Sequence, residues 1–345
     1  MKKISMQDIA DKLHISKNSV SQALGDKGGV SEQTKMRVRK TAEEMGYDYR
    51  KRATFKQNTP HHKNTFALFA TDFALSHKSF FGEIIRYIEK EMKKYGNELC
   101  IFRVSPENIS SNSLPAAFSK SAYQGLFILS HINRPFIQLL LDLQLPTVMI
   151  DHHDPHLDTD CVLCQNKTGG YLATEFLINQ GHKKIGFLGD IDWSPSYEER
   201  WEGYMKALRD NQLPVEKALM ITGIQEKRSV LYKELEALAN KVSDLPTAWL
   251  CANSGMGFIL ISYFQSIGYR IPEDISVCCF DNTEFTVLSN PQITTMAIDL
   301  RDMGRKAVQL LEWRLDHPSH SHLEIRLPAH LIERESTSAV SLSGK

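Results

Sequence analysis

The chain has 345 residues, of which 42% are hydrophobic and 24% charged, and its 41 Lys and Arg balance 41 Asp and Glu. This composition is typical of a folded soluble protein and excludes disorder over the whole chain, and the length predicts two or three domains. No apolar run approaches the roughly 20 residues of a membrane span, and the start lacks the apolar stretch of a signal peptide. Six cysteines in so long a chain form no disulfide framework. We therefore expect a cytoplasmic protein.

The neutral total conceals a charge difference along the chain. Residues 1–63 contain 14 Lys and Arg but 7 Asp and Glu, a net charge of +7, so the remainder carries −7. A small basic segment joined to a larger acidic one indicates a polyanionic partner for the basic part. A solvated run of charges would give the same count, so the pattern within residues 1–63 has to decide.

Three short helices are predicted in the basic segment. Apolar residues recur at helical spacing in each: Ile9, Ala10 and Leu13; Val20, Ala23 and Leu24; Val38, Ala42 and Met45. Ser5, Ser16 and Ser31 stand at the three N-cap positions, and Ser5 forms a capping box with Asp8. Glycines follow the second and third helices and end them.

Two helices joined by a very short turn, with a third bracing them, form a helix-turn-helix. Between the apolar positions of the second helix, the polar side chains project outward: Lys17, Asn18, Ser21 and Gln22. Asn and Gln can bond adenine in bidentate fashion, and Lys can reach guanine or phosphate. The pattern therefore predicts a helix that enters the major groove of DNA, and a module that binds only proteins is the alternative.

This segment resembles the headpiece of the LacI/GalR family, the lactose-repressor family. The matching residues are Ile9 to Asp11, Ile15 to Leu24, Val30, Ser31, Thr34, Gly46 and Tyr47. The resemblance implies a sequence-specific regulator that binds double-stranded DNA as a homodimer. It assigns base reading to Lys17, Asn18 and Gln22, and positioning on the phosphate backbone to the hydroxyl residues Ser16, Ser21, Ser31 and Thr34.

The segment after Tyr47 differs from the family pattern. A short hinge helix normally follows, with a leucine that enters the minor groove, but here Lys56 occupies that position and cannot unstack bases as an apolar side chain does. Phe55 can take this role one position earlier; alternatively, Arg50 and its basic neighbours contact only phosphates. We expect residues 1–47 to form the headpiece and residues 48–64 an altered hinge and linker.

Residues 65–337 alternate apolar strands with helices. Strands are predicted at 66–70, 99–104, 125–129, 147–150, 184–188, 218–222, 248–251 and 275–280, and a helix over 81–94 from Ile84, Ile85, Ile88 and Met92. This alternation predicts a doubly wound parallel architecture that occurs twice. Because ligands bind at the carboxyl ends of such strands, we expect a site in the cleft between two lobes.

The resemblance to the LacI/GalR family continues through this region. Matching segments are 124–128, 146–151, 166–171, 181–185, 200–204, 246–248, 272–277, 280–282, 291–295 and 331–336. The resemblance implies that the all-α helix-turn-helix headpiece is followed by an α/β two-lobed, periplasmic-binding-protein-like domain over 65–337, which binds an effector and dimerises. Residues 338–345 then form a tail.

Carried over position by position, the resemblance implies six effector-binding residues: Phe80, Phe81, Ser196, Arg200, Asn253 and Asp281. Arg200 and Asp281 offer donors and acceptors to hydroxyls, and an aromatic ring can pack on a sugar face, so a small polar ligand such as a sugar suits them. Core packing of the phenylalanines and a structural ion pair between Arg200 and Asp281 are the alternatives. Gln165 and Ser254 replace two aspartates usual in the family, which leaves open a less hydroxylated, a phosphorylated or a different ligand.

Other chemistry finds little support. His152, His153 and His156, like His317, His320 and His322, lie in polar runs without helix-spaced ligands, so we expect no metal. Cys161 and Cys164 have the gap of a zinc or redox pair but fall on a buried strand with no second pair, which favours inert thiols. No nucleophile elbow, phosphate-binding glycine loop or acid/base pair is visible. We therefore expect neither a cofactor nor catalysis.

Two classes of function compete. The first is a transcriptional regulator, a repressor by preference, that binds a pseudo-palindromic operator as a dimer and responds to a sugar-like effector. The second is a cytoplasmic carbohydrate-binding or carbohydrate-processing protein whose basic segment is only a docking module. Retardation of promoter DNA distinguishes the two.

Overall fold

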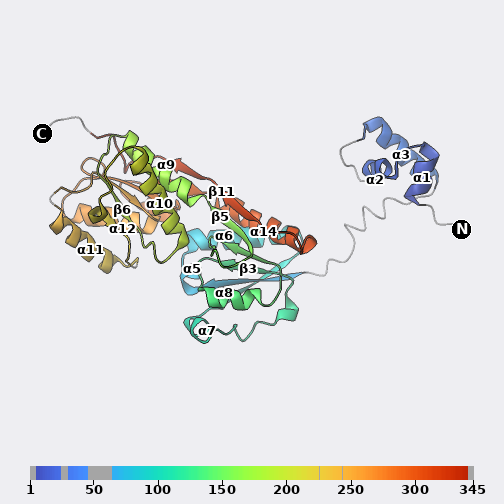
Figure 1. Ribbon diagram of the computed structural model, residues 1–345, viewed down its shortest axis with the longest axis horizontal. Coiled ribbons are helices and arrows are strands. Elements are labelled where there is room, and N and C mark those ends of the chain that lie inside the picture. Colours follow the sequence, from blue (N-terminus) through green and yellow to red (C-terminus); the bar gives the residue numbers. More distant parts are fainter. Residues whose placement is uncertain (1–4, 25–29, 46–63, 225, 243, 341–345) are drawn as a thin grey trace. The chain divides into compact units, whose positions relative to one another are not determined.

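The computed structural model describes residues 5–24, 30–45, 64–224, 226–242 and 244–340. These residues belong to two compact units, one within residues 1–63 and one within residues 64–345 (Figure 1). Of the hinge and linker expected at residues 48–64, only Asn64 is among the described residues. Arg50, Phe55 and Lys56 lie outside them.

The first unit consists of three helices, as predicted: α1 (Met6–Leu13), α2 (Lys17–Leu24) and α3 (Glu32–Glu44). Its fully buried side chains are Ile9, Ala10, Val20, Ala23, Val38 and Ala42. The predicted caps are confirmed, because Ser5, Ser16 and Ser31 each accept a hydrogen bond from the backbone N–H three residues later. A left-handed His14, with φ of 51°, ends α1 and makes the turn to α2 short.

The second unit contains two six-stranded sheets. The first has the order β11-β5-β4-β3-β1-β2 and is parallel throughout. Its strands are β1 (Thr65–Thr71), β2 (Glu98–Val104), β3 (Leu126–Leu129), β4 (Thr147–Ile150), β5 (Asp160–Cys164) and β11 (Glu324–Leu327). Helices α5 (Asp72–Ser76), α6 (Glu83–Lys94), α7 (Pro106–Ser111), α8 (Arg134–Leu141) and α14 (Leu300–Asp316) accompany it.

Alternation along β1 divides the core of this lobe between the two faces of its sheet. Phe66 and Leu68 belong to the core that α6 and α14 help to form, whereas Ala67 and Phe69 belong to the core that contains residues of α8. All four side chains are fully buried. A strand covered on both faces is expected to be continuously apolar, which is why 66–70 could be recognised in the sequence.

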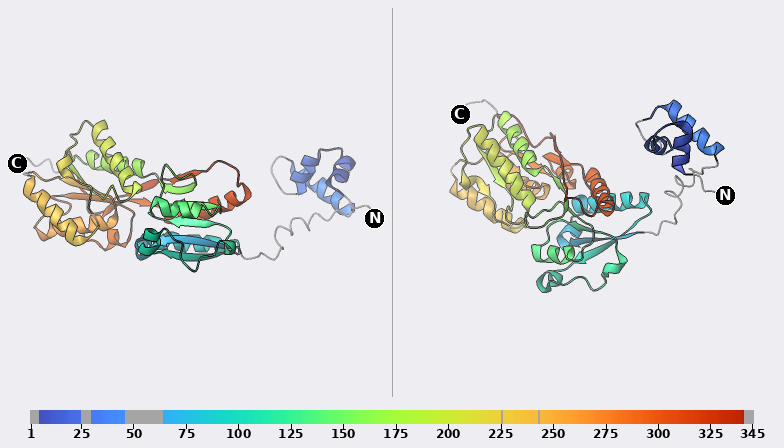
Figure 2. Two further views of the ribbon diagram at one scale, coloured as in Figure 1. Left: turned by 60° about the horizontal axis from the view of Figure 1, so that its bottom comes forward. Right: turned by 45° about the vertical axis from the view of Figure 1, so that its right-hand side comes forward.

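The second sheet has the order β12-β10-β9-β8-β6-β7, and only its β10–β12 pair is antiparallel. Its strands are β6 (Ile185–Leu188), β7 (Met220–Ile221), β8 (Ala248–Cys251), β9 (Ser276–Phe280), β10 (Thr294–Ile298) and β12 (Ala329–Ile332). Its helices are α9 (Asn166–Asn179), α10 (Pro195–Asp210), α11 (Arg228–Lys241), α12 (Ser254–Ser266) and α13 (Glu284–Leu288). Figure 2 shows the two lobes from two further directions.

The chain passes between the lobes three times: from β5 to α9, from β10 to α14, and from β11 to β12. The two doubly wound lobes predicted from the alternation of strands and helices are therefore confirmed. In such an arrangement the carboxyl ends of the strands define where a ligand can bind.

Three features differ from the predictions. β10, β11 and β12 were not predicted. Two of them, β11 and β12, are four-residue strands that keep exposed positions and so lack a continuous apolar run. β7 is only two residues long, since the 3-10 helix Lys217–Leu219 takes the start of the predicted strand. A π-helical turn, Lys78–Gly82, precedes α6. Among the described helices, none is long and apolar enough to cross a membrane.

Helices α9 and α10 are packed through two glycines. A Cβ atom on Gly203 would lie 2.1 Å from the carbonyl oxygen of Lys167, and one on Gly170 would lie 2.1 Å from that of Arg200. Only glycine allows two helix backbones to approach this closely. The contact fixes the position of α10, which carries several residues of the site described next.

Candidate functional sites

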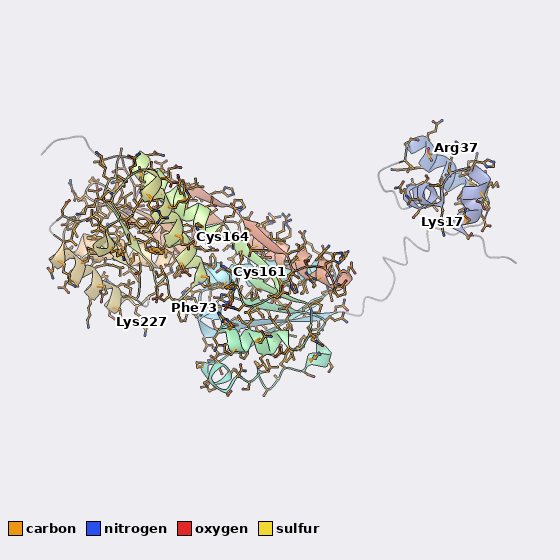
Figure 3. All side chains as sticks on the ribbon, viewed as in Figure 1. Lys17, Arg37, Phe73, Cys161, Cys164 and Lys227 are labelled. Carbon is orange, nitrogen blue, oxygen red and sulfur yellow. The ribbon has the colours of Figure 1, made fainter. Side chains whose placement is uncertain are left out.

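Helix α2 presents a polar surface on the first unit. Lys17 is exposed on this helix (Figure 3). Asn18 and Ser21 are also exposed and Gln22 is half-buried, while Val20 and Ala23 are fully buried against α1 and α3. The structure thus places the four side chains on the outside of a packed helix, as the spacing predicts. An exposed helical row of amide, hydroxyl and ammonium groups can hydrogen-bond to base edges and phosphates.

Of the four hydroxyl residues assigned to the phosphate backbone, Ser16, Ser31 and Thr34 lie at helix starts, whereas Ser21 lies within α2. Ser16 Oγ accepts from Ser19 N at 3.0 Å at the start of α2. Ser31 Oγ accepts from Thr34 N at 3.2 Å and lies 2.9 Å from Thr34 Oγ1 at the start of α3. Ser16 and Ser31 cap their helices. The free backbone N–H groups at each helix start, together with the positive end of the helix dipole, suit an anionic oxygen.

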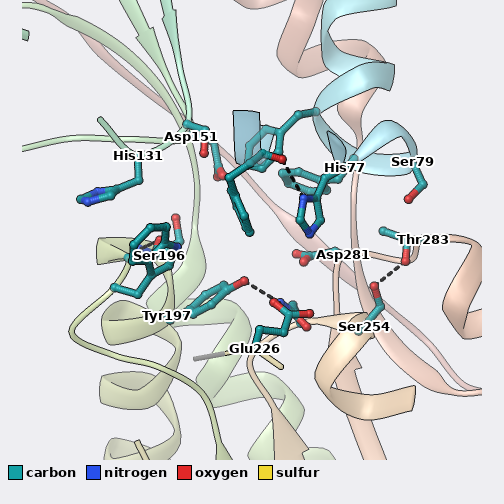
Figure 4. A pocket seen from close by; sticks show the side chains of 18 of the residues that line it. His77, Ser79, His131, Asp151, Ser196, Tyr197, Glu226, Ser254, Asp281 and Thr283 are labelled. Carbon is teal, nitrogen blue, oxygen red and sulfur yellow. Dashed lines mark hydrogen bonds between the residues drawn. The ribbon is translucent and has the colours of Figure 1, made fainter. Parts of the chain in front are cut away.

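A pocket lies between the two lobes of the second unit (Figure 4). It encloses about 660 Å³ of empty space, including its open mouth. All six residues that the family resemblance assigned to an effector line it: Phe80, Phe81, Ser196, Arg200, Asn253 and Asp281. They come from four separate elements or loops, so the fold brings together residues up to 201 positions apart in the sequence.

Arg200 is the centre of the polar network. Its Nε donates to Asn166 Oδ1 at 2.9 Å, its Nη1 donates to the carbonyl oxygen of Ala252 at 2.5 Å, and Nη1 lies 2.9 Å from Asp281 Oδ1. The guanidinium also stacks on the ring of Phe280, 4.3 Å from its centroid. Arg200 is 1% exposed. The ion pair that was one alternative reading of Arg200 and Asp281 is therefore present, and both residues nevertheless line the pocket.

Three pocket residues have left-handed backbone conformations. Ser130, Asp151 and Asp281 have φ of 67°, 55° and 85°, and each directly follows the last residue of a strand, β3, β4 and β9 respectively. This region of φ is unfavourable for residues with a Cβ atom, and such strain is concentrated at binding and catalytic sites. The three side chains are consequently turned into the pocket where a parallel sheet ends.

Asn253 connects a helix cap to the pocket wall. Its Oδ1 accepts from Met256 N at 2.8 Å and caps α12, while its Nδ2 donates to Tyr197 Oη at 2.5 Å and to Glu226 Oε2 at 2.7 Å. Beside it, the hydroxyls of Ser254 and Thr283 are hydrogen-bonded to each other. The position of Asn253 is thus set by the start of α12.

Aromatic rings form the rest of the wall. Phe73, Trp193, Tyr197 and Phe285 line the pocket, and the Phe73 and Trp193 rings meet edge to face with centroids 5.8 Å apart. Phe80 and Phe81 line it too but are only 6% and 7% exposed, so they also contribute to the core. Trp193 is 44% exposed at the pocket, whereas Trp249 is fully buried in β8.

Sequence reasoning missed two carboxylates of the pocket, Asp151 and Glu226. Asp151 could have been found because it directly follows a buried strand, whereas Glu226 lies in the loop between β7 and α11 and carries no comparable signal. The pocket is therefore lined by three carboxylates, Asp151, Glu226 and Asp281, although Gln165 and Ser254 replace two aspartates that are usual in the family.

Burial changes the acidity of these groups. Burial raises the pKa of Asp151 to about 7, with Asp281 and Glu199 adding to the effect and Arg200 opposing it. The pKa values of Glu226 and Asp281 are also raised by burial, although Asn253 and Arg200 respectively counteract this. Burial lowers the pKa of His131, which keeps this ring neutral.

The alternative chemical sites behave as structural elements. Cys161 and Cys164 lie on β5 in cores on opposite faces of the sheet, and burial raises the pKa of each to about 12 (Figure 3). The His317 ring stacks on Trp313, with ring centroids 4.7 Å apart. Within the described ranges, no group of three His, Cys, Asp or Glu side chains could hold a metal ion.

Comparison with known proteins relates both units to characterised families. The model of "Bacterial regulatory proteins, lacI family" matches residues 5–48, and that of "Periplasmic binding protein-like domain" matches residues 174–337. The HTH-type transcriptional repressor PurR of Aliivibrio salmonicida (strain LFI1238) is 29% identical over 336 residues, which cover 96% of this chain and 98% of the relative.

Solved structures show the same fold. A complex of the transcriptional regulator CelR with cellobiose aligns with a TM-score of 0.70 at 20% identity, over 96% of this chain and 99% of the other. The lac repressor dimer bound to its operator and the anti-inducer ONPF aligns with a TM-score of 0.68 at 22% identity, over 98% and 100%.

Proposed function

The chain belongs to the lacI family of bacterial regulatory proteins, and we propose that it is a DNA-binding repressor of transcription whose operator affinity is controlled by a small polar effector. The single observation that carries this proposal is the pairing of an exposed polar row on α2 with a polar pocket between two lobes of the same chain. A protein that docks or processes carbohydrate would need the pocket but not the row.

The DNA-binding part of the proposal rests on the first unit. Lys17, Asn18 and Gln22 read base edges in the major groove, and Ser16, Ser21, Ser31 and Thr34 fix the unit on the phosphates. The basic charge of residues 1–63 supplies the non-specific attraction to DNA. A homodimer would place two α2 helices about one helical turn apart on a pseudo-palindromic operator, and a regulator of chromosomal genes acts in the cytoplasm.

The effector part rests on the pocket. Phe80, Phe81, Ser196, Arg200, Asn253 and Asp281 contact the ligand, which bridges the two lobes. A sugar or sugar derivative is favoured because polar groups converge there beside aromatic rings, and because a similar structure binds cellobiose. A ligand that prefers one lobe arrangement changes DNA affinity, and DNA must then change ligand affinity by the same factor.

The test is retardation of promoter DNA taken from the flanking genes, with the full-length chain at low salt. Retardation that survives an excess of unrelated DNA supports the proposal. If the intact dimer retards no promoter fragment, or retards all DNA equally, the proposal fails and the carbohydrate-binding alternative remains. Thermal-shift screening of the same protein against sugars and sugar derivatives then identifies the effector, because a ligand selective for the folded state raises its melting temperature.

A further inference from the structure

The charges of the pocket indicate which kind of effector it accepts. Resting on the function proposed above, we propose that the effector carries a positively charged amine, held by the carboxylates of Asp151 and Glu226, and that phosphorylated compounds are rejected.

The carboxylates outnumber the cations. Of the residues that line the pocket, Asp151, Glu226 and Asp281 are acids and Arg200 is the one Lys or Arg. Arg200 is already committed, because its guanidinium is paired with Asp281 and donates to Asn166 and to the backbone of Ala252. It therefore compensates Asp281, and no Lys or Arg among the lining residues remains for the other two acids.

Two histidines, His77 and His131, also line the pocket. His77 Nδ1 lies 2.8 Å from the carbonyl oxygen of Phe73 and donates to it, and a positive charge on this ring lowers the pKa of Glu226 and of Asp281. His131 is kept neutral by burial. The adjoining part of the cavity adds an acid, Asp190, together with the exposed Lys227. Acids therefore outnumber Lys and Arg among the described residues that line the whole cavity.

The Asp151 carboxyl is only partly satisfied, because Ser196 hydrogen-bonds to it but its Oδ1 lacks a partner among the described residues. Its Oδ1 is shielded from solvent and receives no hydrogen bond from any described residue. Its left-handed backbone directs the side chain toward the pocket rather than back along β4 (Figure 4). A buried carboxylate oxygen without a donor costs free energy, which a ligand that brings a charged N–H group would recover.

Glu226 is placed by its neighbours in a similar way. Asn253 Nδ2 donates to Oε2 at 2.7 Å, and Oε1 lies 2.2 Å from the position that a Cβ atom on residue 255 would occupy. Gly255 therefore makes the room that lets this carboxylate turn toward the cavity. Both Glu226 and Asp281 carry raised pKa values because they are buried, and a nearby ligand cation would stabilise their charged forms.

The walls between these acids also favour a cation. Phe73, Trp193, Tyr197 and Phe285 turn aromatic surface toward the cavity, and an ammonium group is attracted to the face of such a ring. A phosphate group would instead bring negative charge next to Asp151 and Glu226 at low effective dielectric, where like charges repel strongly. The same pocket thus attracts amines and rejects phosphates.

The test compares matched compounds on the full-length protein by isothermal titration calorimetry. Two sets are used: glucose, glucosamine and glucose 6-phosphate; and sorbitol, 1-amino-1-deoxysorbitol and sorbitol 6-phosphate. We expect at least one amine to bind about tenfold more tightly than its neutral parent, the increment typical of a charge-assisted contact, and neither phosphate to bind. If neither amine binds more tightly than its neutral parent, or if either phosphate ester binds, the proposal is overturned.

Variants locate the preference. Asp151→Asn and Glu226→Gln keep the shape of the side chains and should each reduce the amine-to-neutral ratio about tenfold, with melting temperature confirming that the protein is folded. Glu198→Gln removes the same charge from an exposed position on α10 and should leave the ratio unchanged. An amine preference that persists in both pocket variants also contradicts the proposal. Promoter DNA retardation by the ligand-free protein is measured in parallel, so that failure of the ligand class is distinguished from failure of the repressor function.

Discussion

At the scale of single residues, the most informative group is a carboxyl that costs stability. Asp151 has a pKa raised to about 7, so in the folded protein it binds its proton more tightly than in the unfolded chain. Its contribution to the free energy of unfolding therefore falls as the pH rises from about 4 to 7 and stays low above that range. A carboxyl whose pKa is raised in this way is typical of binding and catalytic sites.

We expect Asp151→Asn to be more stable than the wild type, and more so at pH 8 than at pH 5. The difference between the two pH values should be on the order of 3 kcal/mol, since most of the titration of Asp151 falls between them. Urea unfolding of both proteins at both pH values measures it. A stability gain that is the same at pH 5 and pH 8 would show that Asp151 has an ordinary pKa.

Arg200 illustrates the opposite case, a charged group on which the fold depends. Arg200→Ala leaves Asp281 buried without its partner and frees acceptors on Asn166 and Ala252, so we expect a loss of about 3–5 kcal/mol in unfolding free energy. A cycle of Arg200→Met, Asp281→Asn and their double variant tests the pair, because the double variant removes both charges and should lose clearly less than the sum of the two single losses. Strict additivity in this cycle would mean that the ion pair is not formed.

Gln22 is one of the residues proposed to contact bases. Gln22→Ala should cost roughly 1–3 kcal/mol in operator affinity and relax the preference at one base pair, because one pair of hydrogen bonds is lost. The matched control is Gln33→Ala, an exposed glutamine on α3, which should bind as the wild type does. Competition assays with single-base variants of the operator separate the outcomes. Equal weakening on every sequence would assign Gln22 to the phosphates instead.

At the scale of elements, the close approach of α9 and α10 positions the pocket. α10 carries Ser196, Tyr197 and Arg200, and its backbone is in contact with that of α9 at Gly203. A methyl group there must separate the helices, so Gly203→Ala should destabilise the protein by about 1–3 kcal/mol and weaken effector binding. Gly223→Ala is the control, because nothing lies within 4 Å of its Cβ position. Equal melting temperatures for the two variants would contradict this account.

The elements also show which parts of the fold a sequence can reveal. The three head helices and the strands β1, β4, β8 and β9 were predictable because caps, helical spacing or continuous apolar runs signal them locally. β11 and β12 were not, since strands such as Glu324–Leu327 alternate charged and apolar residues and gain their partners only from distant chain segments. Tertiary pairing, rather than local preference, decides such strands.

The same distinction applies to the pocket. Six lining residues could be named from the family resemblance, although only Arg200 and Asp281 fall within its matching segments. Glu226 could not, because its place depends on a hydrogen bond from Asn253 and on the space left by Gly255, and both are properties of the folded chain. Three-dimensional packing therefore supplied the acid that changes the expected ligand chemistry.

At the scale of the whole effector-binding unit, an ion pair connects the lobes beside the pocket. Arg326 on β11 lies 2.8 Å from Glu199 on α10, and His153 Nε2 lies 3.6 Å from the same carboxylate oxygen. Glu199 also accepts from Asn166, at the crossing from β5 to α9. Because these groups belong to different lobes or to a crossing segment, their contacts stabilise the arrangement in which the pocket is formed.

Arg326→Gln should shift the balance away from this arrangement. Since the ion pair between Arg326 and Glu199 is only partly buried, we expect its loss to destabilise the pocket-forming arrangement of the lobes by about 0.5–1 kcal/mol. Effector affinity should then fall two- to fivefold, although no residue of the pocket is changed. Arg305→Gln, which removes an exposed pair within α14, is the control and should leave the affinity unchanged. Titration of the effector into each variant measures the effector affinity. Titration of the operator with and without effector measures how the effector changes operator affinity, and the operator must change effector affinity by the same factor. An unchanged affinity in Arg326→Gln would mean that the lobes are held by the crossing segments and cores alone.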